Sequence, residues 1–234
     1  MTDKDCKYSV IFFDADRTIL DFAESERQML GEVFAEYGLP CDETILAVYR
    51  KHNDAQWRLH EDGLASKEQI LLQRFVDTFA ELDFPMEVCR KVAERYEYKL
   101  ADGFHVMKGA EETLAKLQGV CDLYLTTNGV ARTQYKRMRG SGLDKYFKKL
   151  FVSEVIGYSK PQYEFFDACF TQTGEKDKSN VLVVGDSLPS DVRGANVFGV
   201  DSCWYNPEGK INDRGVVPTY EIRDLSQIFD VIKK

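Results

Sequence analysis

Short apolar runs alternate with segments of helical period along most of this chain, and that alternation restricts the fold more than any other feature of the sequence. The first run, Tyr8–Phe13, is rich in β-formers, and its shortness favours a buried strand over a helix. Strands that alternate with helices predict a parallel sheet covered by helices on both faces. Further strands are expected at Asp122–Thr127, Lys149–Glu154, Val181–Val184 and Val200–Tyr205.

Helical segments lie between these strands, and several are followed by a glycine, which readily adopts the left-handed conformation that ends many helices. The helices are expected at about residues 109–118, 131–139, 161–173 and 189–198. The glycines expected to end them are Gly119, Gly140, Gly174 and Gly199.

Residues 22–101 have mostly helical patterning and no convincing strand. Gly38 and the proline two residues later are expected to end a first helix. Ser66 and Gln69 have the spacing of a capping box at the start of another helix, and Pro85 suits the first turn of a third. Its aromatic side chains are expected to form the core of a helical bundle; they include Trp57, Phe75 and Phe79.

These patterns together predict an α/β protein. Residues 1–21 and 102–234 are expected to form a Rossmann-like parallel-sheet core, and residues 22–101 an inserted α-helical domain.

Composition narrows the function. The net charge is −8 and the pI is near 5.1, so no long-range field attracts a nucleic-acid polymer or an acidic membrane. No apolar stretch approaches the roughly 20 residues of a membrane span, and the N-terminus lacks the apolar core of a signal peptide. The six cysteines are scattered, without a CxxC pair, which is typical of a reducing compartment. We therefore expect a cytoplasmic protein.

Two pairs of acids follow predicted strands, at the sheet edge where α/β proteins bind ligands. Asp14 and Asp16 come directly after the first strand, and Asp186 and Asp191 follow the strand that begins at Val181. Carboxylates are the ligands that Mg²⁺ prefers, so Mg²⁺ is the expected cofactor. An EF-hand loop also begins D-x-D, but it needs a glycine at its sixth position, where this chain has isoleucine.

Two further segments at this edge could bind a phosphoryl group. In "LTTNG", Thr127 and the backbone of Asn128 could cradle a phosphoryl oxygen, although Asn-Gly is also a common turn pair and Thr126 is the alternative threonine. Lys160 precedes a proline that favours an extended backbone at the lysine and the start of a helix after it. A lysine held there could neutralise phosphate charge.

Together these residues resemble the haloacid dehalogenase superfamily of phosphohydrolases. The resemblance covers nearly the whole chain, and the helical insertion resembles the superfamily's cap. Arg17 occupies a place where relatives have acidic or small residues, which leaves its role open. The four motifs match in order as Asp14, Asp16 and Thr18 for D-x-D-x-T, Thr127, Lys160, and Asp186 and Asp191 for G-D-x-x-x-x-D.

The resemblance implies a division of roles. Asp14 would be the nucleophile that forms an aspartyl-phosphate, and Asp16 the general acid and base. Mg²⁺ would be bound by the carboxylates of Asp14 and Asp186 and by the backbone carbonyl of Asp16. The phosphoryl oxygens would be held by Thr127, the Asn128 backbone and Lys160. Thr18 and Asp191 would orient the residues that bind the metal and the phosphate, Asp191 by holding the metal's waters or by orienting Lys160.

Three stretches resemble the cytoplasmic pyrimidine 5′-nucleotidases of this superfamily: Ile11–Phe22, Trp57–Phe75 and Cys203–Ile228. They imply a small phosphomonoester substrate, with pyrimidine nucleoside monophosphates above purines, and Phe22 is a candidate substrate neighbour. The nearest alternative is a phosphatase for phosphoglycolate or sugar phosphates. A 2-haloacid dehalogenase needs neither Mg²⁺ nor a second acid, a phosphomutase would retain the phosphate, and an inactive binding module would lack a motif residue. A monomer or a small homo-oligomer is expected.

Overall fold

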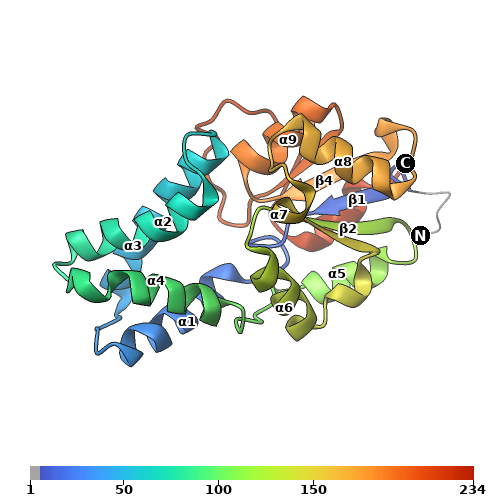
Figure 1. The fold of residues 1–234 in the computed structure, drawn as a ribbon. Helices are drawn as coiled ribbons and strands as arrows, with labels where there is room; N and C mark the ends of the chain where they lie inside the picture. Colours follow the sequence, from blue (N-terminus) through green and yellow to red (C-terminus); the bar gives the residue numbers. More distant parts are fainter. Residues whose placement is uncertain (1–5) are drawn as a thin grey trace. The chain divides into compact units, whose positions relative to one another are not determined.

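The computed structural model describes residues 6–234, and it divides into two compact units (Figure 1). Residues 6–21 and 104–234 belong to one unit, called the sheet unit below. Residues Phe22–Gly103 belong to the other, called the helical unit. Within the described part of the chain, none of the helices combines the length and the apolar character that crossing a membrane requires.

The sheet unit contains a six-stranded sheet in the order β3-β2-β1-β4-β5-β6, in which all neighbouring strands are parallel. This confirms the predicted α/β fold. The strands are β1 Val10–Phe13, β2 Asp122–Thr127, β3 Lys149–Val152, β4 Val181–Gly185, β5 Asp201–Tyr205 and β6 Tyr220–Ile222.

The strand order reverses direction at β1, which lies between β2 and β4. Phe13, the last residue of β1, pairs with Leu125 of β2 on one side and with Val184 of β4 on the other. The carboxyl ends of these three strands are therefore nearly level, and such a switch point is where open α/β sheets bind their ligands.

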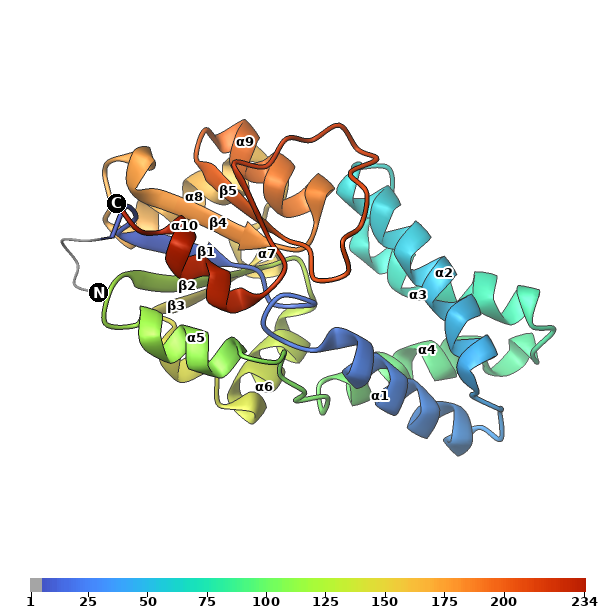
Figure 2. The ribbon, with the colours of Figure 1, turned by 180° about the vertical axis from the view of Figure 1, so that it is seen from behind.

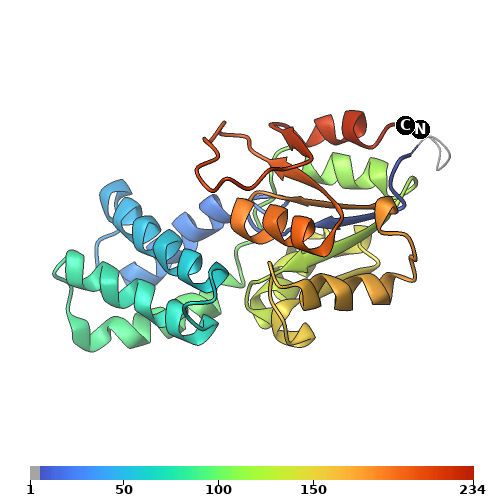
Figure 3. The ribbon, with the colours of Figure 1, turned by 90° about the horizontal axis from the view of Figure 1, so that it is seen from above.

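The two faces of the sheet carry separate apolar cores, because successive side chains of a strand point to opposite faces. Ile11 and Phe13 pack in a core with α5, α6 and α10, whereas Val10 and Phe12 pack in a second core with α8 and α9. Figure 2 shows α5 and α10 on one face, and Figure 3 shows the sheet nearly edge-on with α10 (red) and α8 (orange) on opposite sides. The helices of this unit are α5 Ala110–Leu117, α6 Ala131–Ser141, α7 Ser153–Ile156, α8 Tyr163–Thr173, α9 Arg193–Phe198 and α10 Ile228–Val231.

Several helix ends in the structure differ from the predicted ones because of tertiary contacts. Gly174 and Gly199 end helices with left-handed backbones, but Gly140 lies inside α6, which ends instead at Gly142 with φ +71°. A Cβ at Gly140 would lie 2.3 Å from the ring of Phe104, so this glycine provides packing space and not a helix end. Gly119 is not left-handed either, because α5 already ends at Leu117.

Other elements differ in extent. The strand predicted to reach Glu154 ends at Val152, because Ser153 begins α7. The predicted helix 161–173 begins only at Tyr163, and the predicted helix 189–198 is a π-helical turn, Leu188–Val192, followed by α9. The short edge strand β6 was not predicted, since its three residues carry no apolar run and are extended through pairing with β5.

The helical unit consists of four helices with a core of its own. The capping box at the start of α3 is confirmed, with the Ser66 hydroxyl accepting from the Gln69 N–H at 3.2 Å and the Gln69 side chain accepting from the Ser66 N–H at 2.9 Å. Gly38 follows the first helix with φ +69°, as predicted, whereas Pro85 precedes the first turn of α4 and is its N-cap. The helices are α1 Phe22–Glu36, α2 Glu43–Glu61, α3 Lys67–Glu81 and α4 Met86–Leu100.

Aromatic residues fill much of that core. Phe75 and Phe79 are fully buried in it, as predicted. The prediction for Trp57 was wrong, because its ring lies outside this core and packs on His60 at 5.7 Å between centroids. Phe22, the first residue of α1, belongs to the same core and is 9% exposed, so its role beside substrate stays a prediction.

Candidate active site

Asp14 is held at the end of β1 by backbone and side-chain contacts. Its N–H donates to the carbonyl of Val184 at 2.8 Å, which continues the pairing of β1 with β4. Thr18 is fully buried, and its hydroxyl donates to Asp14 Oδ2 at 3.3 Å. Between them Arg17 has a left-handed backbone, with φ +62°, which makes the turn tight enough to bring Thr18 back beside Asp14.

Lys160 is the cation that links the motifs. Its buried ammonium group donates to Asp14 Oδ1 at 2.6 Å, to Asp191 Oδ1 at 2.7 Å and to the carbonyl of Thr126 at 2.9 Å. An ammonium has three donors, so each has an acceptor. Burial lowers the pKa of Lys160, but the carboxylates of Asp14 and Asp191 outweigh burial and raise that pKa above its ordinary value. Lys160 is therefore charged at neutral pH.

The side chain of Asn128 fixes the backbone of Lys160. Its amide nitrogen donates to the Lys160 carbonyl at 2.9 Å, and its amide oxygen accepts from the Lys160 N–H at 2.9 Å. The sequence had suggested only the backbone of Asn128 as a phosphate contact, so this reciprocal pair is an additional finding. It joins the end of β2 to the loop that carries the lysine.

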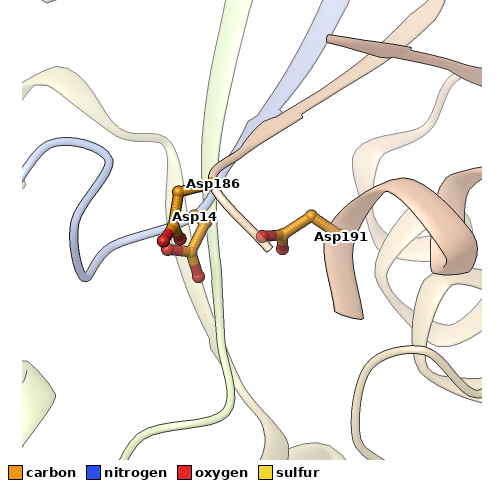
Figure 4. Close-up of side chains that lie close together, drawn as sticks. All are labelled: Asp14, Asp186 and Asp191. Atoms are coloured by element: carbon orange, nitrogen blue, oxygen red, sulfur yellow. The ribbon is translucent and has the colours of Figure 1, made fainter. Parts of the chain in front are cut away.

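Three carboxylates converge at the switch point, as Figure 4 shows. Asp14, Asp186 and Asp191 each offer an oxygen, and these oxygens all lie within 4.8 Å of one another. Burial raises the pKa of Asp14 well above its ordinary value. The neighbouring carboxylates of Asp191 and Asp186 raise this pKa further, and the charge of Lys160 only partly offsets the increase. More positive charge is therefore needed to keep Asp14 ionised, and oxygen donors at this spacing fit a hard divalent cation such as Mg²⁺.

Asp191 is oriented by its own turn and by the absence of a side chain at Gly185. Its second oxygen, Oδ2, accepts from the N–H of Ser187 at 3.2 Å, while Oδ1 accepts from Lys160. A Cβ at Gly185 would lie 2.2 Å from the Asp191 carboxyl carbon. In the sequence Gly185 is the glycine of the G-D-x-x-x-x-D motif, and its place directly before Asp186 could have indicated this tight approach.

Asp16 points its carboxylate to two side chains of α6 that sequence reasoning missed. Arg137 Nη1 donates to Asp16 Oδ1 in a short ion pair, and Gln134 Nε2 donates to Asp16 Oδ2 at 2.8 Å. Both residues are buried, and they lie on α6, the helix that begins just after the "TTNG" segment. Residues three apart share one helical face, so helical periodicity could have placed them on the inner face with Met138.

The two adjacent threonines have different surroundings. Thr126 directs its hydroxyl to the carbonyl of Phe13 at 3.4 Å, inside the sheet. Thr127 Oγ1 accepts from the Gly129 N–H at 3.0 Å and from Gln134 Nε2 at 2.7 Å. A hydroxyl has two acceptor lone pairs and one donor, so the hydrogen of Thr127 is left to donate to a bound oxygen. This geometry favours Thr127 over Thr126 as a phosphate contact.

Comparison with known proteins identifies the family to which the residues of this site point. The model of the family "haloacid dehalogenase-like hydrolase" matches residues 8–199. The chain is similar to the HAD-hydrolase YfnB of Bacillus subtilis, with 35% identity over 97% of this chain and 96% of the relative. It is also similar to the pyrimidine 5′-nucleotidases PynA of Streptococcus pneumoniae (32% identity, 97% and 96% covered) and YjjG of Escherichia coli (28% identity, 97% and 99% covered).

A crystal structure of YfnB bound to magnesium, which reveals interdomain movement, matches this fold with a TM-score of 0.91 and 36% identity. The match covers 96% of this chain and 98% of the YfnB chain.

Proposed function

The chain belongs to the haloacid dehalogenase-like hydrolases and is a phosphatase of that family, and from this premise we propose that it is a Mg²⁺-dependent phosphomonoesterase with Asp14 as nucleophile. The observation that carries the proposal is the buried contact of Lys160 with both Asp14 and Asp191, next to Asp186. This arrangement presents a nucleophilic carboxylate beside fixed positive charge, which phosphoryl transfer requires.

In the first step, Asp14 attacks phosphorus in line with the leaving oxygen. The bond from phosphorus to the ester oxygen breaks, a bond from phosphorus to Asp14 forms, and Asp16 gives its proton to the leaving alcohol. In the second step, Asp16 takes a proton from water as the water attacks phosphorus. The bond to Asp14 then breaks, and inorganic phosphate and the free carboxylate are released.

The remaining residues bind the phosphoryl group and balance its charge. Lys160, by exchanging one of its three present acceptors, and the hydroxyl of Thr127 would contact phosphoryl oxygens, with Asn128 holding the lysine in place. Asp14 and Asp186, with the Asp16 carbonyl, would hold Mg²⁺, which when bound supplies charge neutralisation as a Lewis acid. While Asp16 is ionised, four carboxylates in and beside the site face two buried side-chain cations, Lys160 and Arg137, so a divalent ion would bring the set to neutrality before Asp16 is protonated and the dianionic substrate binds.

The proposed substrates are nucleoside 5′-monophosphates, with the pyrimidines dUMP and dTMP above the purines. Support comes from the similarity to PynA and YjjG over 97% of this chain. The acidic charge of the whole protein supports a single small monoester over a nucleic-acid polymer. The six free thiols support the cytoplasm as its compartment.

The helical unit is proposed to act as the cap that distinguishes substrates. Replacing residues 23–100 by a short linker is expected to lower discrimination among large esters more than hydrolysis of small ones. Unchanged selectivity would show that this unit reads no part of the substrate.

The test is a comparison of kcat/KM at one Mg²⁺ concentration for dUMP, dTMP, dAMP, dGMP, phosphoglycolate and glucose phosphates. Asp14→Asn purified in the same way is the matched control, because it exposes any contaminating phosphatase. We expect dUMP or dTMP to exceed the purine nucleotides by about tenfold to a hundredfold, the range that one well-placed hydrogen bond provides. A tenfold preference for phosphoglycolate or a sugar phosphate would refute the nucleotidase assignment and leave the phosphatase activity supported.

A further inference from the structure

We infer that Gln134 and Arg137 are positioning residues that fix the carboxylate of Asp16 for proton transfer and tie it to Thr127. The inference rests on the proposed function, because it assumes that Asp16 is the general acid and base. Neither side chain belongs to the motifs that identify the family in this sequence.

The three side chains form a closed hydrogen-bonded triangle. Arg137 Nη1 donates to Asp16 Oδ1, and Gln134 Nε2 donates to Asp16 Oδ2 at 2.8 Å. Arg137 Nη1 also donates to Gln134 Oε1 at 3.1 Å, which completes the triangle. Each oxygen of Asp16 thus has its own donor, so the carboxylate cannot rotate about its last bond without losing one of them. This contact fixes both its position and its plane.

Burial makes this arrangement expensive, which argues against a purely structural origin. Arg137 is fully buried and Gln134 is 1% exposed, whereas Asp16 is only partly buried. Removing a guanidinium from water costs several kcal/mol, and well-packed apolar residues can replace buried ion pairs with no loss of stability. An apolar side chain at position 137 could pack beside Met138 in the same core. The arginine supplies what an apolar residue cannot, which is two directed bonds from a rigid planar group.

Gln134 also connects the acid to the phosphate-binding loop. Its amide nitrogen has two hydrogens, one directed to Asp16 and the other to Thr127 Oγ1 at 2.7 Å. Space for this side chain depends on Gly129, where a Cβ would lie 2.7 Å from three atoms of Gln134. One side chain therefore sets the separation between the group that transfers the proton and a group that holds the phosphoryl oxygen.

A misplaced acid affects esters unequally, and this provides a specific measurement. A nucleoside leaves as an alcohol and needs a proton, whereas p-nitrophenolate is a stable anion that leaves without one. General acid catalysis contributes about 10²–10⁴-fold where it is needed. Damage to the fold, to metal binding or to phosphate binding would instead slow both esters alike. The ratio of kcat/KM for dUMP to that for p-nitrophenyl phosphate thus reports the position of Asp16.

The variants are Arg137→Met and Gln134→Met, with Arg139→Met as the matched control, since Arg139 is exposed on the same helix. We expect Arg137→Met to lower kcat/KM for dUMP about a hundredfold and to leave p-nitrophenyl phosphate within about threefold of wild type. Arg137→Lys should recover part of the loss. A larger pre-steady-state burst of p-nitrophenol is expected, because breakdown of the Asp14 intermediate still needs Asp16 as base.

A double-mutant cycle tests whether Arg137 acts through Asp16. In an Asp16→Asn background, Arg137→Met should cause little further loss with dUMP, because residues that act as one unit are not additive. Should Arg137→Met fail to fold, Gln134→Met and Gly129→Ala disturb the same triangle without removing the buried charge. Melting temperature and competitive inhibition by inorganic phosphate monitor the fold and the phosphate site.

The outcomes separate the two claims. Equal losses for dUMP and p-nitrophenyl phosphate, or a full additional loss in the Asp16→Asn background, would overturn the positioning role and leave the proposed function intact. If the wild type hydrolyses neither ester, the proposed function fails first. An unequal loss that disappears in the Asp16→Asn background supports the inference.

Discussion

Gly185→Ala is expected to damage this site strongly although it adds a single methyl group. The new Cβ would lie 2.2 Å from both the carboxyl carbon and Oδ2 of Asp191. Carbon atoms in contact are normally about 3.5–4.0 Å apart, so Asp191 must move by more than about 1 Å. Its Oδ1 accepts from Lys160 Nζ at 2.7 Å, and a shift of that size breaks this hydrogen bond.

The size of the effect follows from the burial of that ion pair. The side chains of Lys160 and Asp191 are each 2% exposed. Lys160 keeps Asp14 as a second partner, so the expected cost is that of one hydrogen bond between charged groups, about 1.5–3 kcal/mol of the free energy of unfolding. For a protein of this size, each kcal/mol lowers the melting temperature by about 2–4 °C, so a decrease of roughly 3–12 °C is expected. Catalysis should fall too, since Lys160 loses one of its three acceptors.

The assay is thermal unfolding in EDTA together with kcat/KM at saturating Mg²⁺. Gly119→Ala is the matched control, because the same methyl group there meets nothing within 4 Å and the backbone is not left-handed. That control should change stability by less than about 0.5 kcal/mol, as surface substitutions usually do.

A double-mutant cycle tests whether the effect of Gly185→Ala comes from its clash with Asp191. An Asp191→Gly background lacks all three of the nearest atoms that the new Cβ would meet, so Gly185→Ala should then have little effect. The reasoning is refuted if Gly185→Ala melts within about 2 °C of wild type, the shift from less than 1 kcal/mol, or if it is equally damaging with and without Asp191.

Four further predictions concern the remaining groups. Asp14→Asn should keep its fold and release phosphate at less than about a thousandth of the wild-type rate; a higher rate would place the nucleophile elsewhere. Burial raises the pKa of Asp14 above its unfolded value, so its contribution to stability is present at low pH and is lost as pH rises through the raised pKa. In EDTA the melting temperature of wild type relative to Asp14→Asn should therefore fall with rising pH, and parallel curves would contradict this. Asp186→Asn should shift the stabilisation by Mg²⁺ to higher concentration, and an unchanged Mg²⁺ midpoint would exclude Asp186 as a ligand. Asn128→Ala removes both bonds to the Lys160 backbone and should cost about 1–3 kcal/mol, measured by denaturant unfolding; an unchanged midpoint would show that these bonds contribute little.

Local sequence determined the elements that carry the motifs. The apolar run before Asp14 and the one before Asp186 are β-strands because their side chains are buried on both faces of a parallel sheet. The capping box at Ser66 also formed as predicted, because its hydrogen bonds join residues only three apart. Such signals are readable because the interactions that produce them are short in sequence.

Tertiary structure decided what the sequence left open. The triangle of Asp16, Gln134 and Arg137 joins residues separated by up to 121 positions, and although helical periodicity could place Arg137 on the inner face of α6, nothing local indicates that Asp16 is its partner. Lys160 likewise reaches Asp14 across 146 positions. Gly140 has the sequence appearance of a helix end, yet the ring of Phe104 determines its role. A single sequence records which groups are available, but the position of each charge depends on contacts between distant segments, and those form only when the sheet brings its strand ends together.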